Sequence, residues 1–248
     1  MQMLTCYDYQ SAQMLSQTDL DLILVGDSAG NVVLGYDETV QVSLDEMITF
    51  CGAVKRGAPN KFVVGDLPFG TYATLESALT NAIRMFQKTG VEAVKLEGAS
   101  SLHTEIIERL VLTGIPVMGH IGLVPQSVHQ MGGYYVHGKD EDSAKALVEQ
   151  ATALEKAGCF AIVLECVENQ LATQITELLS IPTIGIGSGK KTDGQVLVLN
   201  DLLKMGAKTP PKFCTPVADF FELKRSLVQG YLDQNRGEDK DNVTETRM

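Results

Sequence analysis

Short runs of apolar residues recur along the chain, and segments with helical periodicity separate them. Runs rich in Val, Ile and Leu lie at 22–25, 62–64, 93–96, 116–118, 161–164, 183–186 and 196–199, and residues 3–5 add one more at the start. Because these runs do not alternate between apolar and polar residues, they are typical of parallel strands buried on both faces. The pattern therefore favours an α/β fold with about eight strands.

The segments between the runs carry signals for the start and the end of helices. Ser43 and Glu46 form a capping box ahead of a helix that Gly57 should end. A second helix is predicted between Thr74, as its cap, and Gly90. The apolar side chains of this second helix recur every three or four residues and should face the core: Leu79, Ala82, Ile83 and Phe86.

The length of the chain matches one closed barrel. Eight strands in 248 residues leave roughly 31 residues for each strand-plus-helix unit, the usual size of a βα repeat. We therefore predict a single (β/α)8 TIM barrel over residues 1–234. A doubly wound open sheet remains the alternative, because the number of strands does not show whether the sheet closes into a barrel. Residues 235–248 are polar, so we expect a mobile tail with too little apolar surface to offset the entropy of ordering.

Charge and cysteine content limit the classes of partner. With 20 Lys and Arg against 31 Asp and Glu, the net charge is −11, which disfavours nucleic acid and anionic membranes as partners. The sequence has no apolar run long enough to span a membrane, and its five cysteines are scattered without a C-x-x-C pair. We expect reduced thiols, a cytoplasmic location and a small molecule or another protein as the partner.

Charged side chains follow five consecutive strand-like runs. They are Asp27, Asp66, the pair Lys95 and Glu97, His120, and Glu165. The carboxyl ends of parallel barrel strands meet at one rim, so these side chains should converge on one mouth. A single acid at such a place most often caps the next helix, but four carboxylates together repel one another unless a cation or a proton compensates them. Oxygen ligands favour a hard ion such as Mg²⁺ over zinc.

Two of these residues are open to more than one interpretation. Lys95 and Glu97 are two residues apart on one strand, so both side chains should point into the barrel. The anionic partner of Lys95 could equally be Glu97 or the carboxylate of a substrate. His120 could be a core histidine with satisfied hydrogen bonds or a catalytic group, since its place after a strand makes the two about equal.

Eight short motifs, taken in order, resemble the ketopantoate hydroxymethyltransferase family. They are TCYDY (5–9), VGDS (25–28), DLPF (66–69), VKLEG (94–98), GHIGLVPQS (119–127), LEC (164–166), IGIG (184–187) and TDGQ (192–195). The similarity runs from about Leu4 to Phe213, and the long block 119–127, followed by GGY at 132–134, is its most specific part.

The resemblance implies an enzyme with a metal cofactor and a folate co-substrate. Family members are Mg²⁺-dependent (β/α)8 barrels that transfer a hydroxymethyl group from 5,10-methylenetetrahydrofolate to 3-methyl-2-oxobutanoate. The product is 2-dehydropantoate (ketopantoate), on the route to pantothenate, and the family forms homodecamers. The chemistry agrees, because a proton next to a ketone is only weakly acidic and its removal needs the developing enolate oxygen stabilised, which Mg²⁺ can supply.

The resemblance also implies roles for residues at matching motif positions. Asp27 and Asp66 correspond to metal ligands that border the keto acid, and Glu97 lies near the metal through water. Glu165 corresponds to the proposed base. The positions that match keto-acid contacts are Ser28, Lys95 and His120.

Two positions depart from the family pattern, and two other functions remain open. His129 and His137 stand where Asn and Gln are expected, and we predict that neither removes the chemistry at the metal. The rival enzyme is a Mg²⁺-dependent keto-acid carbon–carbon lyase of the isocitrate-lyase type, which typically uses a cysteine in a Lys-Lys-Cys loop that this sequence lacks. The other rival is a non-enzymatic scaffold barrel, which would not need charged groups after five successive strands.

Overall fold

The computed structural model describes residues 1–127, 129, 133 and 135–245, although it does not describe the side chains of 237–245. The chain divides into two compact units, Met1–Val198 and Leu199–Met248. All the strands named below belong to the first unit.

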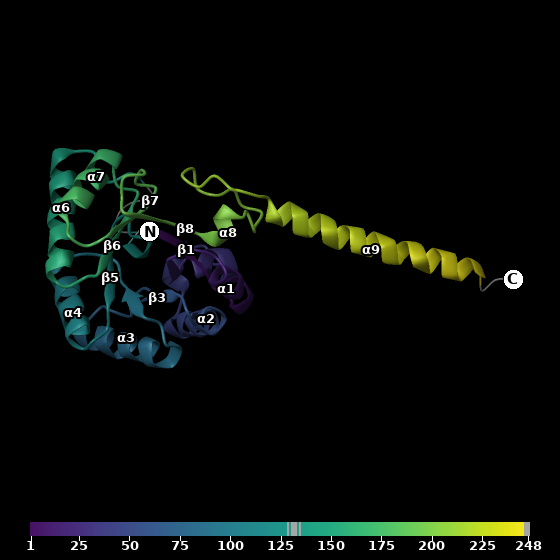
Figure 1. Ribbon diagram of the computed structural model, residues 1–248, viewed down its shortest axis with the longest axis horizontal. Coiled ribbons are helices and arrows are strands. Elements are labelled where there is room, and N and C mark those ends of the chain that lie inside the picture. Colours follow the sequence, from purple (N-terminus) through teal and green to yellow (C-terminus); the bar gives the residue numbers. More distant parts are fainter. Residues whose placement is uncertain (128, 130–132, 134, 246–248) are drawn as a thin grey trace. The chain divides into compact units, whose positions relative to one another are not determined.

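Eight parallel strands close into a barrel in chain order (Figure 1). They are β1 (Gln2–Thr5), β2 (Leu22–Val25), β3 (Phe62–Asp66), β4 (Ala93–Lys95), β5 (Val117–Gly122), β6 (Ala161–Glu165), β7 (Thr183–Ile186) and β8 (Gly194–Leu197). The ring closes through β1, where Met3 lies opposite Leu22 of β2 on one side and opposite Val196 of β8 on the other. An open doubly wound sheet would have two unpaired edges. The closed ring excludes that alternative and confirms the predicted (β/α)8 barrel.

Apolar side chains fill the interior of the barrel. The buried cluster comprises Met3, Leu22, Leu24, Val64, Ala93, Met118, Ala161, Val163, Ile184 and Val196. Side chains along a strand alternate between its faces, so Asp66, two residues after Val64, and Lys95, two residues after Ala93, point the same way. The apolar interior therefore continues into a polar layer at the carboxyl ends of the strands.

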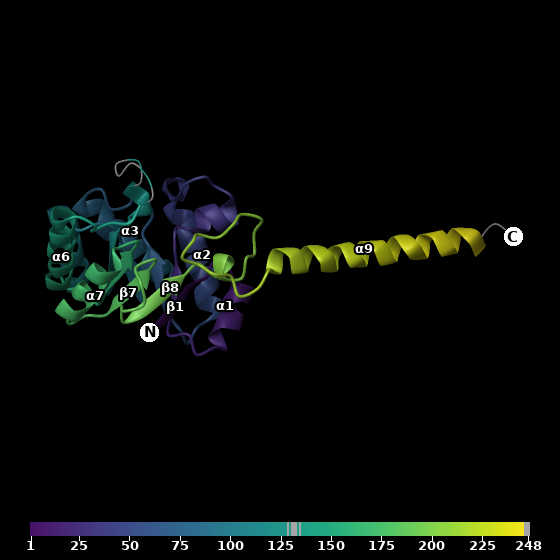
Figure 2. The same ribbon diagram turned by 90° about the horizontal axis from the view of Figure 1, so that it is seen from above.

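Helices cover the outside of the barrel (Figures 1 and 2). Those of the first unit are α1 (Tyr9–Ser16), α2 (Leu44–Gly57), α3 (Leu75–Thr89), α4 (Ser101–Leu112), α6 (Glu141–Lys156) and α7 (Asn169–Leu178). The short turns η1 (Gly30–Leu34), η2 (Thr39–Gln41) and η3 (Pro125–Ser127) lie in the loops. The predicted helix signals are confirmed, because Ser43 caps α2 in a box with Glu46, Thr74 caps α3, and Gly90 ends α3 with a φ of 72°.

The buried face of α3 differs from the predicted one. Its buried residues are Ala78, Ala82, Met85 and Thr89. The other predicted core residues, Leu79, Ile83 and Phe86, are only half-buried, so the prediction is confirmed in full at Ala82 and in part at these three positions. Small residues explain the difference: a Cβ on Gly65 of β3 would lie 2.8 Å from the sulfur of Met85, so this helix lies very close to the sheet.

Two strand boundaries also differ from expectation. β5 continues to Gly122, so His120 lies inside a strand instead of ending it. No helix lies between β7 and β8, and all of the connecting residues, 187–193, are described. The Ser188 hydroxyl fixes this connection, since it donates to the Leu164 carbonyl at 2.8 Å and accepts from the Val167 amide at 2.9 Å. Seven residues at ~3.3 Å each are enough to return along a short strand in extended form.

The second unit holds α8 (Leu199–Leu202) and the long helix α9 (Phe220–Glu245). The segment between them folds back on α8, because the Val217 amide donates to the Leu202 carbonyl at 2.9 Å. Helix α9 includes 235–245 of the expected tail, while 246–248 lie outside the described residues. The mobility of 235–248 and the domain boundary at residue 234 stay predictions. Among the described residues, no helix is both long and apolar enough to cross a membrane.

Candidate active site

Polar side chains gather at the carboxyl ends of β2, β3, β4 and β6. Asp66, Lys95 and Glu165 are the last residues of β3, β4 and β6, and Asp66 lies opposite Lys95 in the strand register. Asp27 follows the end of β2 by two residues, and Glu97 follows the end of β4 by two. Because every strand of the barrel is parallel, these side chains share one mouth, as predicted from their places in the sequence.

Three of the carboxylates form what we term the acidic cluster: Asp27, Asp66 and Glu97. One oxygen from each lies within 4.8 Å of the others, and all three residues are buried. Burial, followed by the charges of Asp66 and Glu97, raises the pKa of Asp27 well above its usual range. Without a further cation, the acidic cluster therefore favours keeping a proton on Asp27.

Lys95 is bonded chiefly to Asp66. Its Nζ donates to both oxygens of Asp66 at 2.7 Å, and it lies 3.6 Å from Oε1 of Glu97. Burial lowers the pKa of Lys95, but the carboxylates of Asp66 and Glu97 outweigh burial and raise it, so the amino group is charged. The sequence suggested Glu97 or a substrate carboxylate as the anionic partner of Lys95. In this structure the main partner is Asp66, and Glu97 makes a second, longer contact.

His120 lies between two carboxylates. Its Nδ1 is 3.4 Å from Oε1 of Glu97, and its Nε2 is 3.3 Å from Oε2 of Glu165. Neither contact has the geometry of a hydrogen bond, and within the part of the chain that the structure describes no other group bonds to either buried ring nitrogen. Burial and Lys95 lower the pKa of His120, but Glu97 and Glu165 outweigh them and raise it to about 9. The imidazole is therefore buried and charged at neutral pH, and it is not a core histidine with satisfied hydrogen bonds.

Ser28 follows Asp27 directly and is held by the first strand-to-helix loop. The hydroxyl of Tyr7 lies 2.8 Å from Oγ of Ser28. All seven predicted site residues therefore lie at the barrel mouth, and six of them are linked by the contacts described above. Tyr7 was not predicted as a site residue, although it lies in the TCYDY motif.

The structure adds Gln126 and Tyr72, which the sequence did not single out. The side-chain amide of Gln126 donates to Oδ2 of Asp27 at 2.8 Å and to the Leu67 carbonyl at 3.0 Å. Its backbone amide donates to Oε2 of Glu97 at 3.1 Å, and its side-chain oxygen accepts from the Tyr72 hydroxyl. Gln126 lies in block 119–127, the most specific of the family motifs, so the sequence could have indicated it as a site residue. Tyr72 belongs to none of the motifs.

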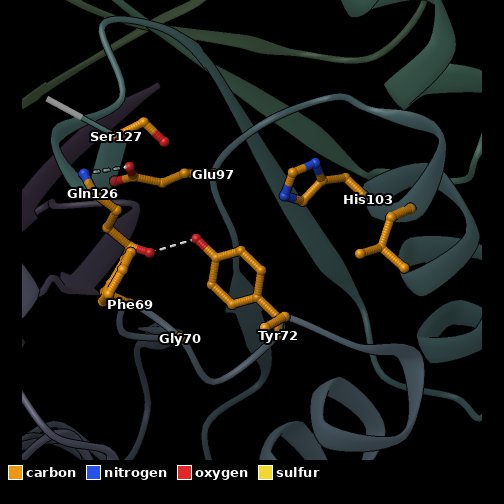
Figure 3. A pocket seen from close by; sticks show the side chains of 9 residues that line it. Phe69, Gly70, Tyr72, Glu97, His103, Gln126 and Ser127 are labelled. Atoms are coloured by element: carbon orange, nitrogen blue, oxygen red, sulfur yellow. Dashed lines mark hydrogen bonds between the residues drawn. The ribbon is translucent and has the colours of Figure 1, made fainter. Parts of the chain in front are cut away.

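A cavity of about 240 Å³ opens beside the acidic cluster (Figure 3). It is lined by Phe69, Gly70, Tyr72, Ala73, Glu97, Leu102, His103, Gln126 and Ser127. The Tyr72 hydroxyl points toward Gln126, and Glu97 is the member of the acidic cluster that lines the cavity. The remaining lining is largely apolar, so a ligand bound at the cluster has uncharged space next to it.

The backbone at Glu165 is unusual. Cys166, which follows it, has a φ of 49°, a left-handed conformation that non-glycine residues rarely adopt. Gly122 lies opposite Glu165 with a φ of 93°, and a Cβ there would lie 2.3 Å from the Glu165 carbonyl oxygen. The close approach of β5 and β6 at this point orients Glu165 beside His120.

Comparison with known proteins agrees with this site. The family model described as "Ketopantoate hydroxymethyltransferase" matches residues 1–239. The chain belongs to the ketopantoate hydroxymethyltransferase family. It is 51% identical over 232 residues to the 3-methyl-2-oxobutanoate hydroxymethyltransferase of Heliobacterium modesticaldum, covering 93% of this chain and 84% of that one. A relative of the same name from Pseudothermotoga lettingae is 51% identical over 231 residues, covering 93% of this chain and 87% of that one.

The family fold is shared with more distant barrels. A solved structure of 2,3-dimethylmalate lyase, a member of the PEP mutase/isocitrate lyase superfamily, matches with a TM-score of 0.59 at 17% identity. The match covers 79% of this chain and 75% of the lyase. At this identity the likeness concerns the barrel alone, so the chemistry follows from the ketopantoate hydroxymethyltransferase family and the residues at the mouth.

His129 and His137, which we expected to differ from the family pattern, each make a contact with a neighbouring residue. Nε2 of His129 lies 2.7 Å from Oε2 of Glu38, on an exposed loop. The ring of His137 stacks on Tyr135 with centroids 4.2 Å apart, and its backbone bridges to Val167. Because both lie in the loop that follows β5, their tolerance by the reaction of a ketopantoate hydroxymethyltransferase stays a prediction.

Proposed function

We propose that this protein transfers a hydroxymethyl group from 5,10-methylenetetrahydrofolate to 3-methyl-2-oxobutanoate, giving 2-dehydropantoate for pantothenate biosynthesis. The observation that carries the proposal is the acidic cluster beside Glu165 and His120 at the mouth of a barrel of this family. A keto acid bound at the cluster would have a carboxylate base next to it, which is what removal of a proton beside a ketone requires.

Mg²⁺ is the cofactor that the donor set fits. The acidic cluster offers only oxygen ligands, and the raised pKa of Asp27 means that burial and neighbouring charges disfavour three bare carboxylates. Asp27 and Asp66 would hold the ion, with Glu97 near it through water. A divalent cation at this place supplies Lewis acidity, which makes the hydrogen next to a bound ketone more acidic.

The keto acid needs cationic and polar contacts for its carboxylate. We assign these to Lys95, which is charged and buried, to the hydroxyl of Ser28, and to His120. Lys95 already donates to Asp66, so its amino group has one further donor for a substrate. Fixing the carboxylate sets the position of the substrate's third carbon.

Glu165 is the proposed base. It takes the proton from the third carbon of the keto acid, and the electron pair left there forms the new bond to the one-carbon unit. The two bonds between that unit and the folate nitrogens break, and a water molecule supplies the hydroxyl group of the product. The two nitrogens take up the hydrogen removed from the keto acid and the second hydrogen of the water, which gives tetrahydrofolate. The imidazole of His120, whose Nε2 lies 3.3 Å from Oε2 of Glu165, keeps the Glu165 carboxylate oriented toward the mouth.

We also propose a homo-oligomer, a decamer as in the family. Support comes from helix α9, whose apolar side chains recur at helical spacing and are exposed to solvent: Phe220, Leu223, Leu227 and Tyr231, with Phe221, Val228 and Leu232 beside them. Light scattering on the full chain should give the mass of ten copies, and Leu227→Lys should lower it. A monomer in both samples would contradict the assembly.

A cytoplasmic location is part of the same proposal. All five cysteines are unpaired, and thiols persist in the reducing cytosol. Fractionation of cells that make the full chain should recover it with cytosolic markers, and recovery with an exported fraction would contradict the location.

The function is tested by product analysis. The full chain, incubated with 3-methyl-2-oxobutanoate, 5,10-methylenetetrahydrofolate and Mg²⁺, should form 2-dehydropantoate that mass spectrometry detects, and none without folate. Cleavage of 2,3-dimethylmalate in place of this reaction would favour a lyase, and no turnover of either substrate would favour a scaffold barrel.

A further inference from the structure

Gln126 connects two carboxylates of the acidic cluster, one through its side chain and one through its backbone amide. Its Nε2 is 2.8 Å from Oδ2 of Asp27, and its backbone nitrogen is 3.1 Å from Oε2 of Glu97. Gln126 is 5% exposed, so water does not replace these bonds easily. One neutral residue thus holds a defined oxygen on each of two acids.

Tyr72 determines which way the Gln126 amide faces. Nε2 of Gln126 has two hydrogens, and both are used, on Asp27 and on the carbonyl of Leu67. Its Oε1 can only accept, and the Tyr72 hydroxyl is the donor that meets it (Figure 3). If the amide turned over, its oxygen would face the carboxylate of Asp27, and its NH₂ group would face Tyr72.

Asp27 depends on this amide more than Asp66 does. Lys95 directs its hydrogen bonds to Asp66, whereas the hydrogen bond described for the Asp27 side chain comes from the neutral Gln126. When a cation is bound and Asp27 is charged, a hydrogen bond to its buried carboxylate fixes the side chain more firmly than a hydrogen bond between two neutral groups would. The orientation of Asp27 is therefore tied to the orientation of Gln126.

We propose that Tyr72 and Gln126 are a positioning pair that sets Asp27 and Glu97 at the spacing which the divalent cation requires. The inference rests on the proposed metal site, but it concerns two residues outside that ligand set. The described hydrogen bond of the Tyr72 hydroxyl goes to Oε1 of Gln126 and not to a carboxylate of the acidic cluster, and the hydroxyl also lies near the backbone of Glu97.

The test is Mn²⁺ binding by the metal-free full chain, followed from the paramagnetic resonance signal of free Mn²⁺. Gln126→Met keeps the length of the side chain and the backbone bond to Glu97, and it should weaken Mn²⁺ binding about 10- to 100-fold. Tyr72→Phe should weaken it about threefold or more. The matched control is Tyr36→Phe, in the loop that follows η1. It removes a hydroxyl that donates to Oε1 of Glu46 on α2 at 2.7 Å, and it should leave Mn²⁺ binding unchanged.

A second readout separates positioning from loss of structure. At saturating Mn²⁺, both variants should return to within about twofold of the unmodified chain in kcat for hydrogen exchange on the keto acid. Unchanged Mn²⁺ affinity in both variants, or a kcat that saturating Mn²⁺ does not restore, would overturn the proposal. Failure of the unmodified chain to bind Mn²⁺ would instead overturn the metal site itself.

Discussion

Nε2 of His120 and Oε2 of Glu165 lie 3.3 Å apart at the mouth of the barrel. Together with Glu97, Glu165 raises the pKa of His120 from 6.5 to about 9 despite burial. The charge of the imidazole is thus part of what stabilises the metal-free fold.

This relationship predicts how stability depends on pH. Because the folded-state pKa of His120 is raised, its stabilising contribution is fully present below pH 6.5 and is lost as pH rises through about 9. We expect a loss on the order of 2 kcal/mol across that window in metal-free protein. Urea unfolding at both ends of the window should show a smaller loss in His120→Asn. Equal losses in the variant and the unmodified chain would contradict this role of His120.

The acidic cluster predicts where the metal binds. Asp27→Asn and Asp66→Asn should each weaken Mg²⁺ binding by more than about 10-fold, because each removes a charged oxygen ligand. Isothermal titration measures the affinity, and the control is Asp45→Asn on α2, which removes an exposed ion pair with Arg84 of α3. If both cluster variants titrate like the unmodified chain, the ligands are elsewhere.

The contact between β5 and β6 predicts a difference between two glycines. Gly114 has a φ of 91° with open space around it, so Gly114→Ala should cost about 1 kcal/mol in stability through backbone strain alone. A Cβ at Gly122 would also clash with the Glu165 carbonyl, so Gly122→Ala should cost more than about 3 kcal/mol. Chemical denaturation compares the two variants. Similar costs would mean that the strands do not meet so closely at Glu165.

The polar end of the chain predicts tolerance to truncation. A chain that ends at Gln234 should keep its turnover, because the described contacts of the acidic cluster, His120 and Glu165 all lie in the first unit. Steady-state rates of the shortened and full chains test this. A large fall in kcat on removal of 235–248 would show that this segment is needed for turnover and would contradict the prediction.

Sequence order explains why much of the site was predictable. Parallel strands bring their carboxyl ends to one rim, so the places of Asp27, Asp66, Glu97 and Glu165 after successive apolar runs were enough to predict one mouth. The positions of the strands followed from the same runs, although β5 extends beyond the run that predicted it.

The remaining features depend on distances that periodicity does not contain. Lys95 pairs with Asp66 because the register of β3 and β4 sets them side by side, and no local pattern specifies that register. Gln126 reaches Asp27 across 99 positions of sequence. The buried face of α3 follows from the close approach of Met85 to Gly65, which depends on the packing of helix against sheet.

The central claim is that Glu165 removes a proton from a keto acid bound beside the acidic cluster. It is tested most directly by deuterium exchange at the third carbon of 3-methyl-2-oxobutanoate in D₂O, with Mg²⁺ present and folate absent, followed by proton NMR. The unmodified chain should exchange this hydrogen, and so should the control Glu149→Gln, which changes an exposed side chain on α6. Glu165→Gln should exchange it about 10²- to 10⁴-fold more slowly and still bind the keto acid. Exchange by Glu165→Gln at the rate of the unmodified chain would contradict the account.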